Sequence, residues 1–129
     1  MTRQDISNRP GAIRDTLYAL VRRARNGLST TEVKTGKLWT DGAEIYRKVV
    51  DTGALTNGSS TTVAHGITGL DTVISMYGMA QNSGTGDQTS LCRADVNLHA
   101  NATNIVINAV TTDLSGYTTS FVVIEYTKA

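Results

Sequence analysis

Two histidines and a single cysteine are the side chains of this 129-residue chain best suited to metal or nucleophilic chemistry. His65 and His99 are far apart in the sequence, and no spacing of other metal-binding residue types completes a site with either of them. Cys92 cannot form an internal disulfide, and no neighbouring residue supplies the base that a thiol nucleophile needs. We therefore predict that both histidines are structural or surface residues. Cys92, in a strand-like stretch, is predicted to be a small buried hydrophobe.

Eight carboxylates are scattered over residues 38–129, and a pair of them on a β scaffold could cleave glycosidic bonds. No spacing singles out such a pair. The glycine-rich stretch 82–87 lacks the following lysine and helix of a phosphate-binding loop, so it is predicted to be a hairpin tip. The sequence therefore predicts a protein that is not an enzyme and that has no cofactor or metal site.

The charged residues divide the chain into a basic and an acidic part. Residues 1–37 contain eight basic and three acidic side chains, whereas residues 38–129 contain four basic and eight acidic ones. Arg22, Arg23 and Arg25 form a basic cluster in the first part. These arginines could complement the negative end of a helix, fit an acidic socket on another protein, or bind a phosphate backbone. Because the rest of the chain is acidic and no aromatic residues are interleaved with the arginines, we expect no nucleic-acid partner.

Residues 11–26 have the pattern of an amphipathic helix, with Pro10 suited to its first turn and Gly27 placed to end it. An apolar stripe must be buried for such a helix to be stable, either on the domain's own sheet or against another chain. The terminal position and the separate charge of this segment favour the second alternative. We therefore predict that residues 1–27 form an attachment or oligomerisation segment, with an interface made of Ile13, Leu17, Leu20, Val21, Ala24, Arg22, Arg23 and Arg25.

Residues 28–129 have the pattern of short strands separated by turns. Strands are predicted at about residues 33–39, 43–53, 60–65, 71–81, 89–93, 95–100, 103–110 and 117–127, with a hairpin at Asn101-Ala102. Alternation places Val96, Leu98 and Ala100 on one face, and likewise Ile105, Ile107 and Ala109. The last strand is apolar on both faces, which indicates a central strand or a face covered by another subunit. The predicted fold is mainly β: an antiparallel β-sandwich of about 7–8 short strands, preceded by one N-terminal amphipathic α-helix.

The most distinctive stretch covers residues 35–48, where a lone tryptophan precedes an Asp-Gly turn and an alternating strand. Trp39, Asp41, Gly42 and Tyr46 define this structural motif. Trp39 and Tyr46 are expected to be packing anchors, because the chain has few other aromatic residues. The motif resembles a module of phage tail-fibre, baseplate and other appendage proteins, in which a tryptophan, an Asp-Gly turn and an Ile-Tyr-Arg-Lys run occur in this order. The resemblance continues through residues 62–67 and 115–128, and it covers most of residues 35–128.

This resemblance implies a β-sandwich that works as a repeated copy, commonly a trimer, on an extracellular particle, without catalytic residues. The expected function is a structural component of a bacteriophage particle, of tail-fibre or baseplate type, anchored by the N-terminal helix. A head-decoration or head-fibre protein and a lectin-like tip that binds a host surface glycan are the alternatives. The expected partners are further copies of the chain, as a homotrimer, and other virion proteins.

The sequence contains neither an apolar run of roughly 20 residues that could span a bilayer nor a secretory signal. We therefore expect no membrane insertion, and synthesis in the host cytoplasm before incorporation into the virion.

Overall fold

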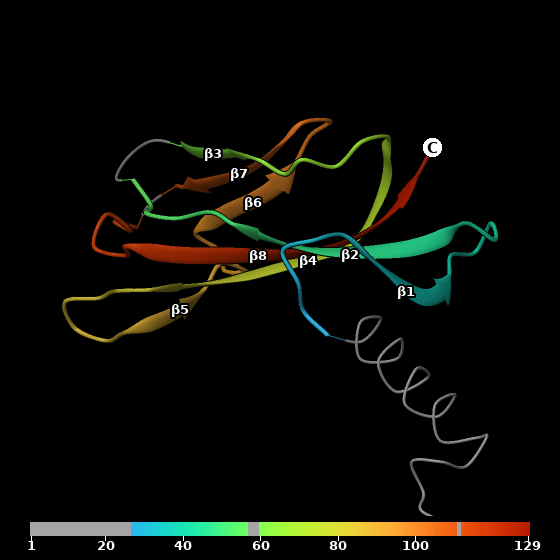
Figure 1. Ribbon diagram of the computed structural model, residues 1–129. Coiled ribbons are helices and arrows are strands. Elements are labelled where there is room, and N and C mark those ends of the chain that lie inside the picture. The colour runs from blue at the N-terminus through green and yellow to red at the C-terminus, as the bar shows by residue number, and fades with distance from the viewer. Residues whose placement is uncertain (1–26, 57–59, 111) are drawn as a thin grey trace, which may run out of the picture.

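The computed structural model describes residues 27–56, 60–110 and 112–129, and these ranges are mainly β. Figure 1 shows the strands in two layers. Their bounds are β1 Val33–Leu38, β2 Glu44–Asp51, β3 Ser60–Ala64, β4 Leu70–Gln81, β5 Gln88–Ser90, β6 Val96–Ala100, β7 Asn104–Ala109 and β8 Thr119–Lys128. The predicted mainly β, antiparallel character and number of strands are confirmed for this part of the chain. The predicted N-terminal helix lies outside the described residues, as do its interface residues Ile13, Leu17, Leu20, Val21, Ala24, Arg22, Arg23 and Arg25.

The strands form two antiparallel sheets with the hydrophobic core between them. The first sheet has the order β1-β2-β8-β4-β5, and the second has the order β3-β7-β6. Val122 and Ile124 from the first sheet belong to the same buried cluster as Ile105 and Ile107 from the second. Inward-facing side chains of two packed sheets interdigitate in this way. The predicted alternation of β7 is confirmed, since Ile105, Ile107 and Ala109 are buried.

Strand β8 is the central strand of the larger sheet and pairs with β2 on one side and β4 on the other. The middle of this strand is buried on both faces, in keeping with its apolar sequence. Val122 and Val123 point to opposite faces, yet both are at most 1% exposed. The prediction of a central last strand is therefore confirmed.

The structural motif of residues 39–46 forms the turn between β1 and the start of β2. The carboxylate Oδ1 of Asp41 accepts a hydrogen bond from the backbone N–H of Ala43 at 2.9 Å, and Gly42 adopts a φ of +86°, which favours glycine. Tyr46 stacks on Tyr126 with ring centroids 5.9 Å apart, as expected of a packing anchor. The same expectation is wrong for Trp39, which lies in the turn with 37% of its surface exposed and does not join the core.

The prediction that Cys92 is buried is also wrong. Strand β5 ends at Ser90, and Leu91 takes the inward position with 0% exposure. Cys92 comes next in the chain and is exposed, with its sulfur 3.8 Å from the carbonyl oxygen of Met76. Cys92 follows the inward-facing Leu91 just beyond the end of β5, where it lies at the surface.

Candidate functional site

The face of the larger sheet that points away from the smaller sheet is the candidate functional site. On β8, Val122 and Ile124 point into the core, so the alternating Phe121 and Val123 point outward. Side chains of directly paired residues lie on the same face of a sheet. The strand pairing therefore places five apolar residues together on the outside, and we call them the outer patch: Val49, Tyr77, Met79, Phe121 and Val123.

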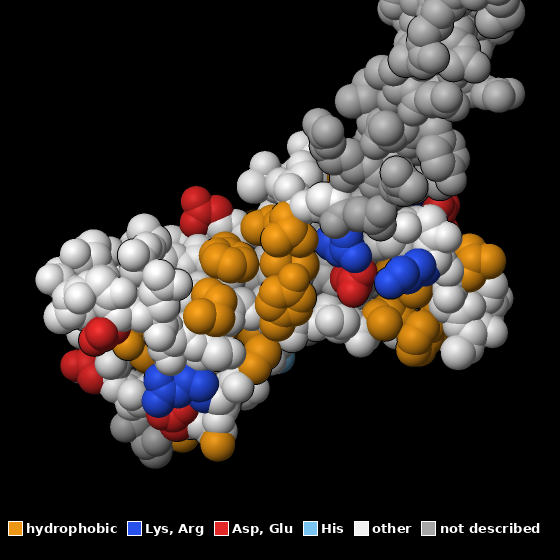
Figure 2. Space-filling model, turned by 90° about the horizontal axis from the view of Figure 1, so that it is seen from below, with side chains coloured by type: hydrophobic (Ala, Val, Ile, Leu, Met, Phe, Trp, Pro, Cys, Tyr) orange, Lys and Arg blue, Asp and Glu red, His pale blue; other side chains and the backbone are white. Residues whose placement is uncertain are grey.

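The outer patch is apolar and partly open to solvent. Tyr77 is 44% exposed and Phe121 is 38% exposed, whereas the side chain of Val123, next to both, is buried. Figure 2 looks onto this side of the molecule and shows hydrophobic side chains gathered near its middle. Single exposed hydrophobic residues are ordinary, but a contiguous group that includes two aromatic rings and a methionine is typical of an interaction surface.

The charges beside the outer patch nearly balance one another. Arg47 and Glu125 are paired on the outer face of β2 and β8, with 2.9 Å between the guanidinium and the carboxylate. Asp51 is the other charged residue that the β2–β8 register places on this face. The outward neighbours on β4 and β5 are the uncharged Ser75, Gln81, Gln88 and Ser90. The face is thus close to neutral.

A shallow hollow of about 120 Å³ lies at one end of the outer patch. Met79 and Phe121 contribute its apolar wall, and Gln81, Gln88 and Thr119 contribute amide and hydroxyl groups. The two loops beside it are joined, because the hydroxyl of Thr118 donates to that of Ser83 at 2.8 Å. The stretch 82–87 is the hairpin tip between β4 and β5, as its composition predicts.

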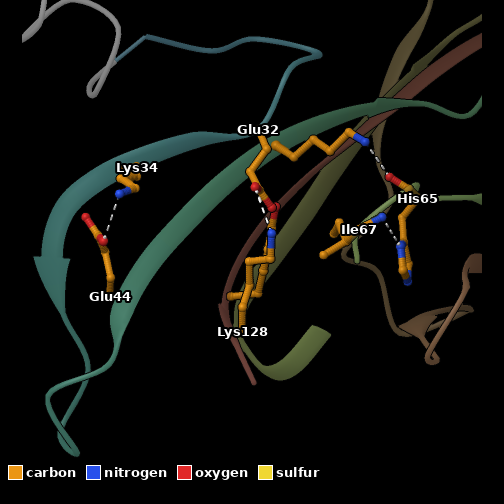
Figure 3. Close-up of polar contacts among 8 residues, drawn as sticks. Glu32, Lys34, Glu44, His65, Ile67 and Lys128 are labelled. Carbon is orange, nitrogen blue, oxygen red and sulfur yellow. Dashed lines mark hydrogen bonds and ion pairs between the residues drawn. The ribbon is translucent and has the colours of Figure 1, made fainter. Parts of the chain in front are cut away.

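The connector that precedes β1 is fastened to the larger sheet. The backbone N–H of Val49 donates to the carbonyl of Ser29 at 2.8 Å. The carboxylate of Glu32 accepts hydrogen bonds from the hydroxyl of Tyr126 and from the ammonium of Lys128, the latter at 3.0 Å (Figure 3). Residues 29–32 are therefore held to β2 and β8.

The electrostatics of this contact favour an ionised Glu32 and a neutral Tyr126. Burial opposes ionisation of Glu32, but the hydrogen bonds from Tyr126 and Lys128 outweigh it and hold the pKa of Glu32 below its ordinary value. Burial and the adjacent Glu32 carboxylate raise the pKa of the Tyr126 hydroxyl well above its ordinary value. Tyr126 therefore acts as a hydrogen-bond donor to a charged acceptor, which is the stronger kind of hydrogen bond.

Replacing Glu32 with glutamine is expected to lower the free energy of unfolding by about 1 kcal/mol at neutral pH, since hydrogen bonds to a charged group are lost. The effect should depend on pH. The pKa of Glu32 is lower in the folded chain than in the unfolded chain, so folding is favoured above the ordinary carboxyl pKa. This contribution is lost as the pH falls below about 4.5 and through the folded pKa. Chemical denaturation of both proteins at pH 7 and pH 3 measures it, and the difference between them should shrink at pH 3.

Glu44→Gln is the matched control, because Glu44 pairs with Lys34 at 3.6 Å and both side chains are more exposed than those of the Glu32 contact (Figure 3). An exposed ion pair contributes little, so this change should cost about 0.5 kcal/mol or less. Equal effects of the two substitutions would show that the Glu32 contact does not hold the connector to the sheet.

The side chains best suited to metal or nucleophilic chemistry, which are His65, His99 and Cys92, do not form a common site. His65 is buried and accepts a hydrogen bond on Nδ1 from the backbone N–H of Ile67 at 3.0 Å (Figure 3). Its Nε2 lies 3.0 Å from the carbonyl oxygen of Asn101. His99 points outward from β6, opposite the apolar face formed by Val96, Leu98 and Ala100. Among the described residues, no group of three His, Cys, Asp or Glu side chains could hold a metal ion. No described helix has the length and hydropathy to cross a membrane.

Sequence reasoning did not identify the outer patch or the Glu32 contact. The one signal for the patch was the double-sided apolar character of the last strand. Tyr77 and Met79 carried no separate signal, because their place beside Phe121 and Val123 follows from a pairing between distant strands.

Comparison of the chain with protein-family models, with curated proteins and with solved structures finds no match. The resemblance of residues 35–128 to phage appendage modules therefore stays a prediction from the sequence.

Proposed function

We propose that this chain is a non-enzymatic structural component of a bacteriophage particle, of tail-fibre or baseplate type. The exposed apolar patch on an otherwise well-packed sheet carries the proposal, because such a surface is used for contact with another protein. The motif of Trp39, Asp41, Gly42 and Tyr46, which resembles phage appendage modules, supports the kind of particle. In this proposal the chain works in the virion with other virion proteins and with further copies of itself.

Residues 1–27 are the attachment segment in this proposal. The connector that follows them is held by Val49 on β2 and by Tyr126 and Lys128 on β8. In this proposal, a mechanical force applied to the N-terminal segment would be transmitted through the connector to β2 and β8 of the larger sheet. The arginines Arg22, Arg23 and Arg25, next to the apolar stripe, suit an acidic socket on a neighbouring virion protein.

Deleting residues 1–27 is expected to leave a folded β domain that no longer incorporates into particles. The described core residues belong to the two sheets and their loops, and the shortened chain retains all of them. Purified particles assembled with the truncated chain as the only copy should lack it in a quantitative protein assay. Circular dichroism of the same purified chain checks that it is folded.

A full-length chain with Leu38→Ser is the matched control, because Leu38 is 67% exposed and lies outside the attachment segment. This variant should incorporate normally. Normal incorporation of the truncated chain would show that residues 1–27 are not the attachment segment.

A lectin-like tip that binds a host surface glycan is the second candidate, and the hollow beside the two joined loops favours it. The hollow combines an exposed aromatic ring, Phe121, with the amides of Gln81 and Gln88, which can donate and accept hydrogen bonds to hydroxyl groups. The small aromatic surface and the modest volume of this hollow make it the weaker candidate. A head-decoration or head-fibre protein would use the same surfaces at another place on the particle.

A further inference from the structure

We propose that the outer patch is a contact between copies of this chain, formed when the larger sheets of two copies pack face to face. This inference deepens the proposed structural function and rests on it, because a repeated copy is what such a component needs. The contact is centred on the exposed side chains of Tyr77 and Phe121, which lie next to the buried Val123.

The composition of the outer patch is that of an interface core. Aromatic residues and methionine are enriched at the centre of protein interfaces, and charged residues are depleted there. The patch consists of Tyr77, Phe121, Met79 and two valines, and its members lie on adjacent strands in the middle of the sheet. Figure 2 shows hydrophobic side chains grouped near the middle of this face.

The charge of the face favours a second copy over the chain's own N-terminal segment. Residues 1–26 contain six arginines and two aspartates, so their electrostatic complement is an acidic surface. The outer face offers the already paired Arg47 and Glu125, together with Asp51. A face so close to neutral can meet an identical face without net repulsion, whereas it offers a strongly basic segment little attraction.

The size of the face is sufficient for a specific contact. Strands of 6, 8, 10, 12 and 3 residues, rising about 3.3 Å per residue and spaced about 4.8 Å apart, cover about 600 Å². A standard protein interface buries about 800 Å² on each partner. A face-to-face contact that used the whole sheet would therefore reach the lower end of the standard range, about 600 Å² on each partner.

Sedimentation velocity of the purified full-length chain at several concentrations tests the proposal. The unmodified chain should form an oligomer, and Tyr77→Lys or Tyr77→Glu should each weaken its association by about 30-fold, the effect of losing a hot-spot side chain. Mixing the lysine and glutamate variants should restore association, because the two charges then face each other across the contact. Val110→Lys is the matched control, since Val110 is 64% exposed and follows β7 of the smaller sheet. It should associate like the unmodified chain.

Three results would overturn the proposal: a monomeric unmodified chain at high concentration, Tyr77 variants that associate normally, and a mixture that stays dissociated. The variant Leu17→Arg tests whether the apolar stripe of the N-terminal segment makes the contact instead of the outer patch. If this variant fails to associate while both Tyr77 variants associate normally, the contact belongs to the stripe. Circular dichroism checks that each variant is folded, and Phe121→Lys repeats the test at a second position. Particle incorporation is measured separately, so a chain that incorporates without self-associating would contradict this contact and leave the proposed function standing.

Discussion

Replacing Gly78 with alanine is expected to destabilise the domain by about 3 kcal/mol, at the upper end of the usual cost of overpacking a core. A Cβ atom at this position would lie 2.5 Å from the carbonyl oxygen of Phe121, 3.0 Å from Leu91 and 3.1 Å from Val122. The first contact is with the backbone of the paired strand, so no side-chain rotation can relieve it. Thermal unfolding should show a decrease in Tm of about 10 °C for a domain of this size.

Gly84→Ala is the matched control for this substitution. Gly84 lies in the hairpin tip, where an added Cβ would be 3.3 Å from the side-chain oxygen of Asn82. That neighbour is a side-chain oxygen rather than backbone and has to move by only a few tenths of an ångström, so the cost should stay within about 0.5 kcal/mol. Equal stability of Gly78→Ala and Gly84→Ala would show that β4 and β8 can separate without cost.

Gly78 also matters for the candidate functional site. It lies between Tyr77 and Met79, which point outward, while its own position on the inner face is covered by the buried Leu91. The missing side chain allows Leu91 to pack directly on β4. The outer patch therefore depends on a close approach on the opposite face of the same strand.

Replacing His65 with leucine is expected to cost about 3 kcal/mol, because both polar partners of the imidazole lose their hydrogen bonds. Ile67 donates its N–H to Nδ1 at 3.0 Å, so the ring donates from Nε2 to the carbonyl of Asn101 at 3.0 Å. Leucine keeps most of the volume and leaves a buried N–H unpaired. Urea denaturation should show a lower midpoint with an unchanged slope.

Two conservative variants identify which hydrogen bond is responsible. Asparagine places an acceptor close to the position of Nδ1, and glutamine places a donor close to the position of Nε2. Each variant should recover part of the stability lost in His65→Leu. Equal stability of the leucine variant and the unmodified chain would show that His65 contributes by its volume alone, rather than by joining the stretch around Ile67 to the β6–β7 turn.

The sequence by itself determined the local features of the domain. The period-two pattern placed Ile105, Ile107 and Ala109 on a buried face, because successive side chains of a strand point in opposite directions. The Asp41-Gly42 turn was predictable for a similar reason, since the aspartate hydrogen-bonds locally and the glycine tolerates a positive φ. These features depend on residues within a few positions of one another.

The tertiary structure alone decided which surfaces and contacts the strands create. Tyr126 and Glu32 are 94 residues apart, and His65 is 36 residues from Asn101, so no local pattern could pair them. The burial of Leu91 and exposure of Cys92 depend on where β5 ends against β4. The outer patch exists because β2, β8 and β4 are neighbours in one sheet. Alternation shows which side chains share a face of one strand, but only strand pairing shows which strands complete that face and whether anything covers it.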